Sequence, residues 1–459
     1  MPKAGVRLIT VAVAVTAALT ALPAATATAA PTASVPVSVQ AGTAATATAG
    51  ATDPFYAYSG SEPLSAFAPG TVLKTRTVPY HLVGIPTPLK AVQLLYRTTD
   101  AQGRPAANVT SVVRSPKGDG TKAVSYQSFY DSLNPEDGPS RAIAGGVTLG
   151  GVIPNVEAIL IAPLLAQGYD LVIPDTEGQR ANFAAGPEYG TNTLDSIRAA
   201  TRSSDTRLGP STAFGLVGYS GGAIATNWAA ALAPSYAPEV NSRLVGYAEG
   251  GLLVNPAHNL KYVGGSLAWS GVIPMAVIGV SRSYDIDLKS YLNAYGLEVY
   301  RKLEHGSIVN AIGQYPGLTW QKMAKPEYAD PNSIPAFVEA MNRLNLGSAA
   351  TPTVPGFIAQ GNAGVLEGTF GNRPGIGTGD GVMVAGDVRT LARQYCATGS
   401  SPVKYSQYEV LSHVSATAAW APVALGWLND RFAGRTAPSD CGRIPAGNSL
   451  APEQPTTRR

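Results

Sequence analysis

The feature that most constrains the fold is a glycine-rich pentapeptide near the middle of the chain. It has the pattern G-x-S-x-G and comprises Gly218, Tyr219, Ser220, Gly221 and Gly222. A strand-like run, Phe214–Val217, precedes it and an alanine-rich helix-like run, Gly222–Leu232, follows it. The pattern alone is weak in a chain with 50 glycines, so the flanking runs carry the inference. Together they favour a nucleophile elbow over a merely structural turn, with the Ser220 hydroxyl held above a sheet.

A serine nucleophile needs a base, and the chain offers four histidines. His81 lies upstream on a strand-like segment, and His258 and His305 fall in a long central stretch that breaks the strand-helix rhythm. His413 follows the last predicted strand and precedes the last predicted helix, where a hydrolase of this kind presents its base. We therefore expect His413 to take the serine proton; a surface histidine is the alternative.

Two aspartates compete for the role of acid. Asp380 and Asp387 both follow the predicted strand Gly356–Gln360 and precede His413. Asp387 stands directly before a predicted helix, so its simplest role is that of an N-cap. Asp380 lies in a glycine-flanked loop with no such local duty, so we prefer it as the group that orients His413.

An oxyanion hole needs two donors. The backbone N–H of Gly221 is one candidate. The second should come from the loop after an early strand, and Asp131, after Ala123–Phe129, is the best placed residue. Because an ionised carboxylate would repel an oxyanion, either the backbone N–H of Asp131 serves or its side chain is protonated. The sequence leaves both alternatives open.

Strand-like and helix-like runs alternate along much of the chain, which predicts an α/β fold: a mostly parallel sheet covered by helices on both faces. The predicted strands are Ala91–Arg97, Val109–Arg114, Ala123–Phe129, Tyr169–Pro174, Phe214–Val217, Gly356–Gln360 and Val403–Val410. The predicted helices are Thr193–Arg202, Gly222–Leu232, Val388–Tyr395 and Ser415–Phe432. Such a sheet with this elbow is the α/β-hydrolase architecture.

The central stretch predicts a helical cap inserted between two parts of the core. We expect core residues 53–254, a cap over 255–350 with helices Leu288–Leu303 and Ile334–Leu344, core residues 351–445 and a disordered tail over 446–459. Ordinary core-filling helices are the alternative for the cap. No membrane-spanning run is expected, since Leu267–Val280 is short and contains a proline.

The first 30 residues predict a cleaved signal peptide and hence secretion. Lys3 and Arg7 precede the apolar run Leu8–Leu22, and alanine-rich cleavage sites follow. A membrane anchor is the alternative, but the run is short for a span. Residues 31–52 consist almost entirely of small, uncharged residues and predict a flexible linker.

Composition excludes some classes of function. The formal net charge is only +3, and two of the positive charges lie in the predicted signal peptide, so a nucleic-acid binder is not expected. The two cysteines, Cys396 and Cys441, are too few for a structural zinc site and predict one disulfide in an exported chain, although free thiols are the alternative. We expect neither cofactor nor metal, and a monomer.

Several runs resemble the secretory lipase family typified by Candida antarctica lipase A. They are GYSGGAIATNWAAALAPSYAPEVN, FYDSLNPEDGPS, DGVMVAGDVRTLARQYC and SHVSATAAW, and the resemblance covers nearly all of Asp53–Pro445. It implies that Ser220, Asp380 and His413 are nucleophile, acid and base, and that Asp131 and Gly221 form the oxyanion hole. It also implies a lipase cap with Leu267–Val280 near the acyl chain. One departure is the glycine-rich stretch Gly361–Gly379, which is longer than the family's usual turn.

Three hypotheses follow. The first is a secreted serine ester hydrolase acting on long-chain acylglycerols, by way of an acyl-enzyme and at a lipid–water interface. The second is a short-chain or aryl esterase, or an acyltransferase, with the same chemistry. The third is a secreted binding protein that kept the fold and lost activity, which the intact serine, histidine and aspartate set disfavours.

Overall fold

The computed structural model describes residues 53–371 and 373–456. The predicted signal peptide and linker lie outside the described residues. From Phe55 onward the chain forms one compact unit, built on a nine-stranded sheet in the order β1-β2-β3-β5-β4-β6-β7-β8-β9. The strands are β1 (Val72–Leu82), β2 (Ile85–Thr99), β3 (Pro105–Val113), β4 (Lys122–Gln127), β5 (Asp170–Pro174), β6 (Ala213–Tyr219), β7 (Leu244–Gly250), β8 (Gly356–Gly361) and β9 (Val403–Tyr408).

The sheet is antiparallel at one edge and parallel over the rest. β1, β2 and β3 pair as antiparallel neighbours, and β3 pairs antiparallel with β5. β5, β4, β6, β7, β8 and β9 then run parallel. The strands β5 and β8 are buried along their whole length because helices cover both faces of the sheet, and most of their residues are apolar. The predicted α/β fold is confirmed.

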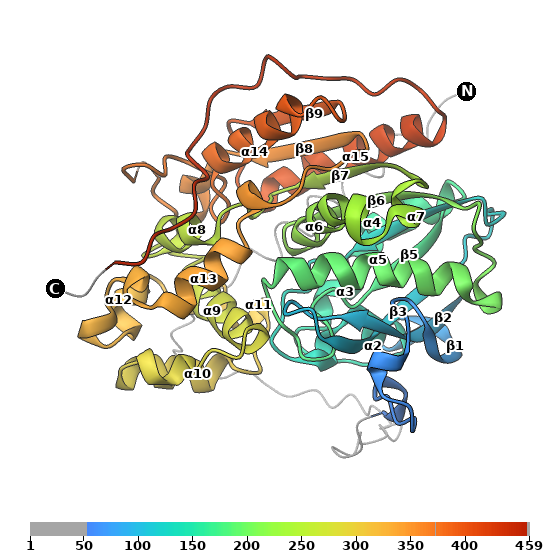
Figure 1. Cartoon of the computed structure of the whole chain (residues 1–459), viewed down its shortest axis with the longest axis horizontal. Helices are drawn as coiled ribbons and strands as arrows, with labels where there is room; N and C mark the ends of the chain where they lie inside the picture. The colour runs from blue at the N-terminus through green and yellow to red at the C-terminus, as the bar shows by residue number, and fades with distance from the viewer. Residues whose placement is uncertain (1–52, 372, 457–459) are drawn as a thin grey trace, which may run out of the picture. The chain divides into compact units, whose positions relative to one another are not determined.

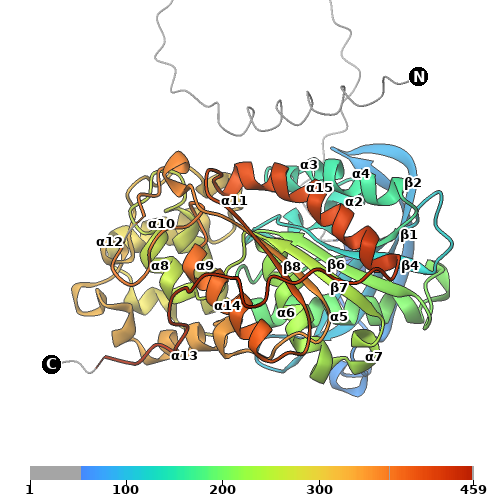
Figure 2. The same ribbon diagram turned by 90° about the horizontal axis from the view of Figure 1, so that it is seen from above.

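Helices cover the two faces of the sheet in separate groups (Figures 1 and 2). The first group is α5 (Gly186–Arg202), α6 (Gly221–Tyr236) and α14 (Ala385–Ala397), which pack with one face of the sheet in the largest apolar cluster. The second is α2 (Pro139–Ile143), α4 (Ala158–Ala166) and α15 (His413–Phe432), which pack on the other face. The short helices α3 (Val152–Val156) and α7 (Pro238–Asn241) complete the core.

Between β7 and β8 the chain leaves the sheet and forms six helices, which lie beyond one end of the sheet (Figure 2). They are α8 (Pro256–Val263), α9 (Val272–Ser283), α10 (Ala294–Leu303), α11 (Ile308–Ala311), α12 (Trp320–Met323) and α13 (Pro335–Arg343). Their apolar side chains form a cluster of their own, joined to the core through residues such as Leu133, Phe183 and Met383. This segment coincides with the stretch predicted to be a cap and is called the cap below.

The predicted elements overlap observed ones, but the prediction was incomplete. The chain forms the strands β1 and β7, which were not among the predicted strands. The predicted helix Leu288–Leu303 is interrupted: a 3-10 turn over Leu288–Tyr291 is followed by α10, whose start is capped when the Asn293 side chain accepts the Gly296 N–H at 2.9 Å.

The predicted disordered tail is wrong for residues 446–456, because polar contacts fasten this segment to both core and cap. Thr390 on α14 donates its hydroxyl to the Asn448 carbonyl at 2.7 Å. Asn345, just after α13, donates to the Leu450 carbonyl at 2.9 Å. The Glu453 N–H donates to Asn342 of α13 at 2.7 Å. We call residues 446–456 the C-terminal strap.

Two further predictions concern stability and membranes. Cys396, on α14, and Cys441 form a disulfide, as the sequence predicted. Within residues 53–371 and 373–456, each helix is too short or too polar to cross a bilayer.

Candidate functional site

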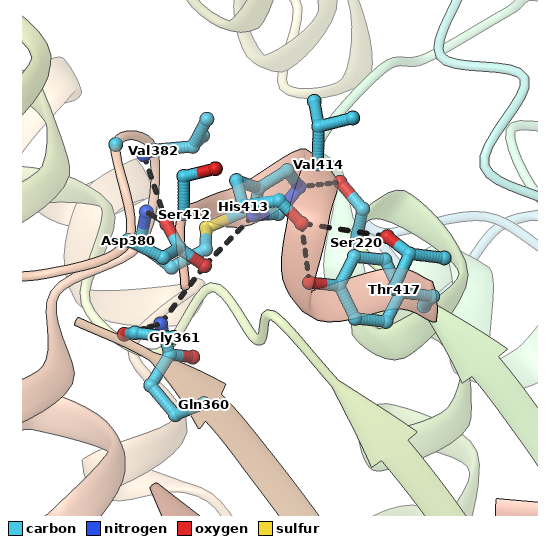
Figure 3. Close-up of polar contacts among 12 residues, drawn as sticks. Ser220, Gln360, Gly361, Asp380, Val382, Ser412, His413, Val414 and Thr417 are labelled. Atoms are coloured by element: carbon cyan, nitrogen blue, oxygen red, sulfur yellow. Dashed lines mark hydrogen bonds and ion pairs between the residues drawn. The ribbon is translucent and has the colours of Figure 1, made fainter. Parts of the chain in front are cut away.

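Ser220 lies at the turn between β6 and α6, where the motif predicted an elbow. Its φ is 53°, a value that L-residues rarely adopt, and its hydroxyl extends above the end of β6 (Figure 3). The glycines allow the tight turn. A Cβ on Gly218 would lie 2.3 Å from the Gly222 carbonyl oxygen, and one on Gly222 would lie 2.0 Å from the Gln127 carbonyl oxygen. Side chains at these two positions would therefore push strand and helix apart.

His413 is the first residue of α15 and lies beside Ser220 (Figure 3). Its Nε2 is 2.7 Å from the Ser220 Oγ, and its Nδ1 is 2.8 Å from Asp380 Oδ2. A capping box of Ser412 and Ser415 fixes the start of the helix. The Tyr219 hydroxyl donates to the His413 carbonyl at 2.6 Å. The structure thus brings together the three residues predicted to be nucleophile, base and acid.

The Asp380 carboxylate is fully buried and accepts hydrogen bonds on both oxygens. Oδ1 accepts the N–H groups of Val382 and Met383 at 2.9 and 2.7 Å. Oδ2 accepts from Gln360 Nε2 at 2.9 Å as well as facing His413 (Figure 3). These donors compensate the loss of water around a buried anion, so the carboxylate is held in one orientation toward the imidazole.

Burial alone would lower the pKa of the His413 imidazole, but neighbouring carboxylates reverse the effect. Asp380 contributes most, by charge and by hydrogen bond, and Glu367 and Asp131 add smaller contributions, so that the pKa lies above its ordinary value of 6.5. A raised pKa makes the imidazole a stronger base once it is neutral, and it stabilises the imidazolium that forms when the serine proton is taken.

Asp387, the competing candidate for the acid, lies elsewhere. It is the third residue of α14 and not its N-cap, which is Val384, so the predicted capping role is wrong. Its carboxylate is 2.9 Å from His258 Nδ1 on α8 and accepts from Asn448 at 2.7 Å. Asp387 therefore joins the core to the cap and to the C-terminal strap.

The predicted oxyanion residues lie next to each other. Gly221 is the first residue of α6, so its N–H is among those at the helix start that lack an intrahelical acceptor. A Cβ on Gly221 would lie 1.8 Å from Asp131 Oδ1, so only glycine leaves room for the Asp131 carboxyl group. Asp131 has a φ of 41°, and its carbonyl accepts the N–H of Ile308 on α11 at 2.8 Å, which ties the loop to the cap.

Burial raises the pKa of the Asp131 carboxyl to about 8; His413 lowers it and Glu157 raises it further. A carboxyl with this pKa carries a proton at neutral pH. The side-chain alternative left open by the sequence, a protonated donor, is therefore compatible with the site.

Two buried glutamates beneath the same loop were not identified from the sequence. Glu157 accepts from the Ser128 hydroxyl, the Phe129 N–H and the Tyr126 hydroxyl, and burial raises its pKa to about 7. Glu177 accepts the Ser132 N–H at 3.2 Å, and burial raises its pKa well above the ordinary value. The sequence did contain an indication that Glu157 is unusual, because it is the one charged residue between Arg141 and Asp170.

A largely apolar cavity of about 790 Å³, including its open mouth, adjoins Ser220, Gly221 and Asp131. The lining side chains recur every three to four residues along two cap helices: Val272, Ala276 and Val280 of α9, and Phe337, Met341 and Leu344 at α13. This spacing is the apolar face of a helix. The cavity lies between the predicted nucleophile and the cap, and its volume suits a small-molecule substrate.

The stretch Gly361–Gly379, which departs from the expected pattern, lies against the base. It begins with the 3-10 turn η9 (Gly364–Glu367), whose Glu367 side chain accepts the Val414 N–H at 2.9 Å and the Trp269 indole N–H at 2.6 Å. Glu367 could not be identified from its local sequence, because a glutamate in a glycine-rich loop is ordinarily solvated. Across the described part of the chain, no group of His, Cys, Asp and Glu side chains is arranged to hold a metal ion.

The sheet order, the elbow and the order serine, aspartate, histidine along the chain define an enzyme of the α/β-hydrolase class. A sequence model of the secretory lipase family matches residues 145–440. The chain belongs to the secretory lipase family, and membership supports a carboxylic-ester hydrolase.

Curated relatives agree with this assignment over most of their length. Lipase 5 of Candida albicans is 31% identical over 420 residues, which cover 87% of this chain and 84% of that protein. A Mycobacterium tuberculosis protein described as a probable inactive lipase is 32% identical over 374 residues, covering 80% and 79% of the two chains. The family thus includes a member described as inactive.

Solved structures give the same fold. Candida antarctica lipase A in its closed state superposes with a TM-score of 0.74 at 26% identity, covering 86% of this chain and 89% of that one. The cell-wall-degrading esterase LipA of Xanthomonas oryzae has a TM-score of 0.58 at 14% identity and covers 79% of this chain and all of that one, a likeness of fold alone.

Proposed function

We propose that this chain is a secreted serine carboxylic-ester hydrolase that cleaves triacylglycerols through an acyl-enzyme intermediate. The observation that carries the proposal is the hydrogen-bonded series Ser220–His413–Asp380, with contacts of 2.7 and 2.8 Å, at the mouth of an apolar cavity. Secretion is supported by the family and by the predicted signal peptide.

The reaction follows from the positions of these groups. The Ser220 oxygen attacks the ester carbonyl carbon while His413 Nε2 takes the hydroxyl proton, giving a tetrahedral oxyanion. The Gly221 N–H and Asp131 stabilise that oxyanion. The intermediate collapses, the carbon–oxygen bond to the alcohol breaks and the alcohol leaves with the proton from His413. Water, activated by His413, then releases the fatty acid and restores the serine.

A lipid–water interface as the place of reaction is supported by the surface near the site. Between residues 142 and 169 the one charged residue, Glu157, is buried, whereas Val147 and Leu149 are more than 60% exposed. This segment lies beside the oxyanion loop, by which we mean the loop after β4 that carries Asp131. Gly150 lies close to Asp137 and Ser307, and Asp137 accepts the hydroxyl of Ser132, the residue after Asp131, at 2.6 Å. Leu366 and Phe370, 67% and 64% exposed, lie in the loop that contacts the start of α15. Apolar groups thus lie near both the oxyanion loop and the base.

The test is hydrolysis by the pure chain of p-nitrophenyl esters with acyl chains from two to sixteen carbons, and of emulsified triolein. Wild-type protein should prefer long chains and release fatty acid from triolein. Ser220→Ala should lose about 10⁶-fold in kcat while its melting temperature stays unchanged.

Each other outcome selects an alternative. A preference for two to four carbons without triolein hydrolysis would indicate a short-chain esterase. Transfer of the acyl group to an added alcohol, at a rate above that of hydrolysis, would indicate an acyltransferase. If the folded protein turns over no ester and a fluorophosphonate does not label Ser220, the proposal is contradicted. The hypothesis that remains is a binding protein that kept the fold and lost activity.

A further inference from the structure

One carboxylate outside the Ser220–His413–Asp380 series contacts two neighbours of the base. Glu367 lies at the end of η9, and its two oxygens serve different elements. Oε1 accepts the N–H of Val414, the second residue of α15, at 2.9 Å. Oε2 accepts the indole N–H of Trp269, in the cap, at 2.6 Å. One side chain therefore joins the glycine-rich loop, the cap and the helix that begins with His413.

Trp269 transmits this contact to the imidazole. Its ring lies nearly perpendicular to that of His413, with the centroids 5.3 Å apart. Gly381, the residue after the predicted acid, leaves the necessary space: a Cβ there would lie 2.8 Å from Glu367 Oε2 and 3.2 Å from the indole nitrogen. Glu367 and Trp269 thus fill a space that the glycine next to Asp380 keeps open.

The loop that carries Glu367 is itself anchored to the turn that carries Asp380. The Gly364 N–H donates to the Gly379 carbonyl at 2.9 Å, and the Thr369 hydroxyl donates to the Gly381 carbonyl at 2.6 Å. These bonds flank Asp380 in sequence. The position of Glu367 is therefore coupled to that of the acid as well as to that of the base.

We propose that Glu367 is a positioning residue for His413, holding the start of α15 and the Trp269 ring against the imidazole and placing a second carboxylate near it. The inference rests on the proposed ester hydrolysis. Glu367 does not touch the reacting atoms; it acts through Trp269, the Val414 amide and its charge. It gives the glycine-rich stretch Gly361–Gly379 a role beside the base.

The charge of Glu367 has a defined direction of effect. The groups that bear on His413 are Asp380 after β8, Glu367 on η9, Asp131 after β4 and the Tyr219 ring on β6. Asp380 and Glu367 raise the pKa of the imidazole, and Asp131 adds to this only when it is ionised. Removing one carboxylate lowers that pKa. Since the neutral imidazole is the active base, the acidic limb of the rate profile should then move to lower pH.

The experiment is the pH profile of kcat/KM for soluble p-nitrophenyl butyrate, with wild type and Glu367→Gln. We expect the acidic limb of Glu367→Gln to lie about half a pH unit below that of wild type, with kcat about tenfold lower at its best pH. Trp269→Phe keeps an aromatic ring against His413 and keeps the Glu367 charge, so it should lower kcat while leaving the limb in place.

Glu409→Gln is the matched control, because Glu409 accepts from Asn362 of the same loop at 2.7 Å and is exposed. Its profile should coincide with that of wild type. The inference is overturned if Glu367→Gln lowers kcat equally at every pH with an unmoved limb, or matches Glu409→Gln throughout. Should Glu367→Gln not fold, an acidic limb in Trp269→Phe that moves from the wild-type position would overturn it instead. If the wild-type protein hydrolyses no ester, the proposed function is contradicted, and the inference about Glu367, which rests on it, is contradicted as well.

Discussion

Two carboxyl groups flank Ser220, and the protein treats them in opposite ways. Asp380, on the side of the base, is buried but accepts two backbone N–H groups, the Gln360 amide and the His413 ring. Asp131, on the side of the oxyanion hole, is buried too, and there desolvation dominates and raises the pKa to about 8.

The two sites differ in the donors that reach the carboxyl group: hydrogen bonds hold the Asp380 side chain in one orientation, whereas desolvation is the main influence on the pKa of Asp131. The base requires a fixed anion to stabilise its imidazolium. The oxyanion requires the opposite, a neutral neighbour or a donor. One residue type can serve both needs because the loop after β8 supplies N–H groups, whereas the loop after β4 places a carboxyl over the first turn of α6.

The largest effect is expected when the charge of Asp380 is removed. Asp380→Asn keeps the size of the side chain but removes the charge and favours the wrong tautomer of His413. We expect kcat for p-nitrophenyl butyrate to fall about 10⁴-fold, with little change in KM.

Asp387→Asn is the control for that change, since Asp387 binds His258 and Asn448 and not the base. Its kcat should remain within about twofold of wild type, with a small loss of melting temperature. If Asp387→Asn is the more damaging of the two, the assignment of the acid is wrong.

A smaller effect on kcat is expected when Asp131 is replaced. At a φ of 41°, asparagine and glycine fit the backbone at position 131 better than alanine would. Asp131→Asn retains an N–H donor and should lose less than about tenfold in kcat. Asp131→Gly removes the side-chain donor and should lose about 10²-fold.

Equal, near-wild-type rates for the two Asp131 variants in the same kinetic assay would mean that the backbone N–H of residue 131 acts without the side chain. That outcome would exclude the protonated carboxyl group of Asp131 from the mechanism. Asp131 and Asp380 would then differ in their surroundings, but only the Asp380 side chain would act in catalysis.

The smallest effect concerns alkaline pH. Asp131 is neutral below a pKa of about 8 and ionises above it, so its charge then opposes the developing oxyanion. We expect kcat to rise as His413 loses its proton and to fall a few-fold between about pH 8 and 9.5. Asp131→Asn should lack the alkaline decline and keep the acidic limb; a decline of equal size in both proteins would contradict this origin. Tryptophan fluorescence at each pH establishes that the protein stays folded.

Much of the fold and the central part of the candidate site could be predicted from the sequence. The elbow was recognisable because its glycines are required by contacts a few residues away, such as Gly218 with Gly222. The order of Ser220, Asp380 and His413 followed from the strand and helix runs that place each residue at the same edge of the sheet. Local patterns and chain order carry this information.

The remainder depends on contacts between distant segments. Glu367, Trp269 and Val414 are separated by up to 145 positions, and nothing in their local sequences indicates that they meet. Asp387 was interpreted as a cap because of its place before a helical pattern, while its partner His258 lies 129 residues away. β7 was missed because glycines interrupt its apolar run, and β1 because it contains several polar residues and is only partly buried. Tertiary partners decide such roles, and a single sequence does not contain them explicitly.

The C-terminal strap has a consequence for movement of the cap. Its contacts reach α14 at Thr390 and the cap helix α13 at Asn342, so it connects core and cap through hydrogen bonds at a place far from the chain segments that enter and leave the cap. Any motion that separates α13 from α14 must therefore break hydrogen bonds to the strap or displace it.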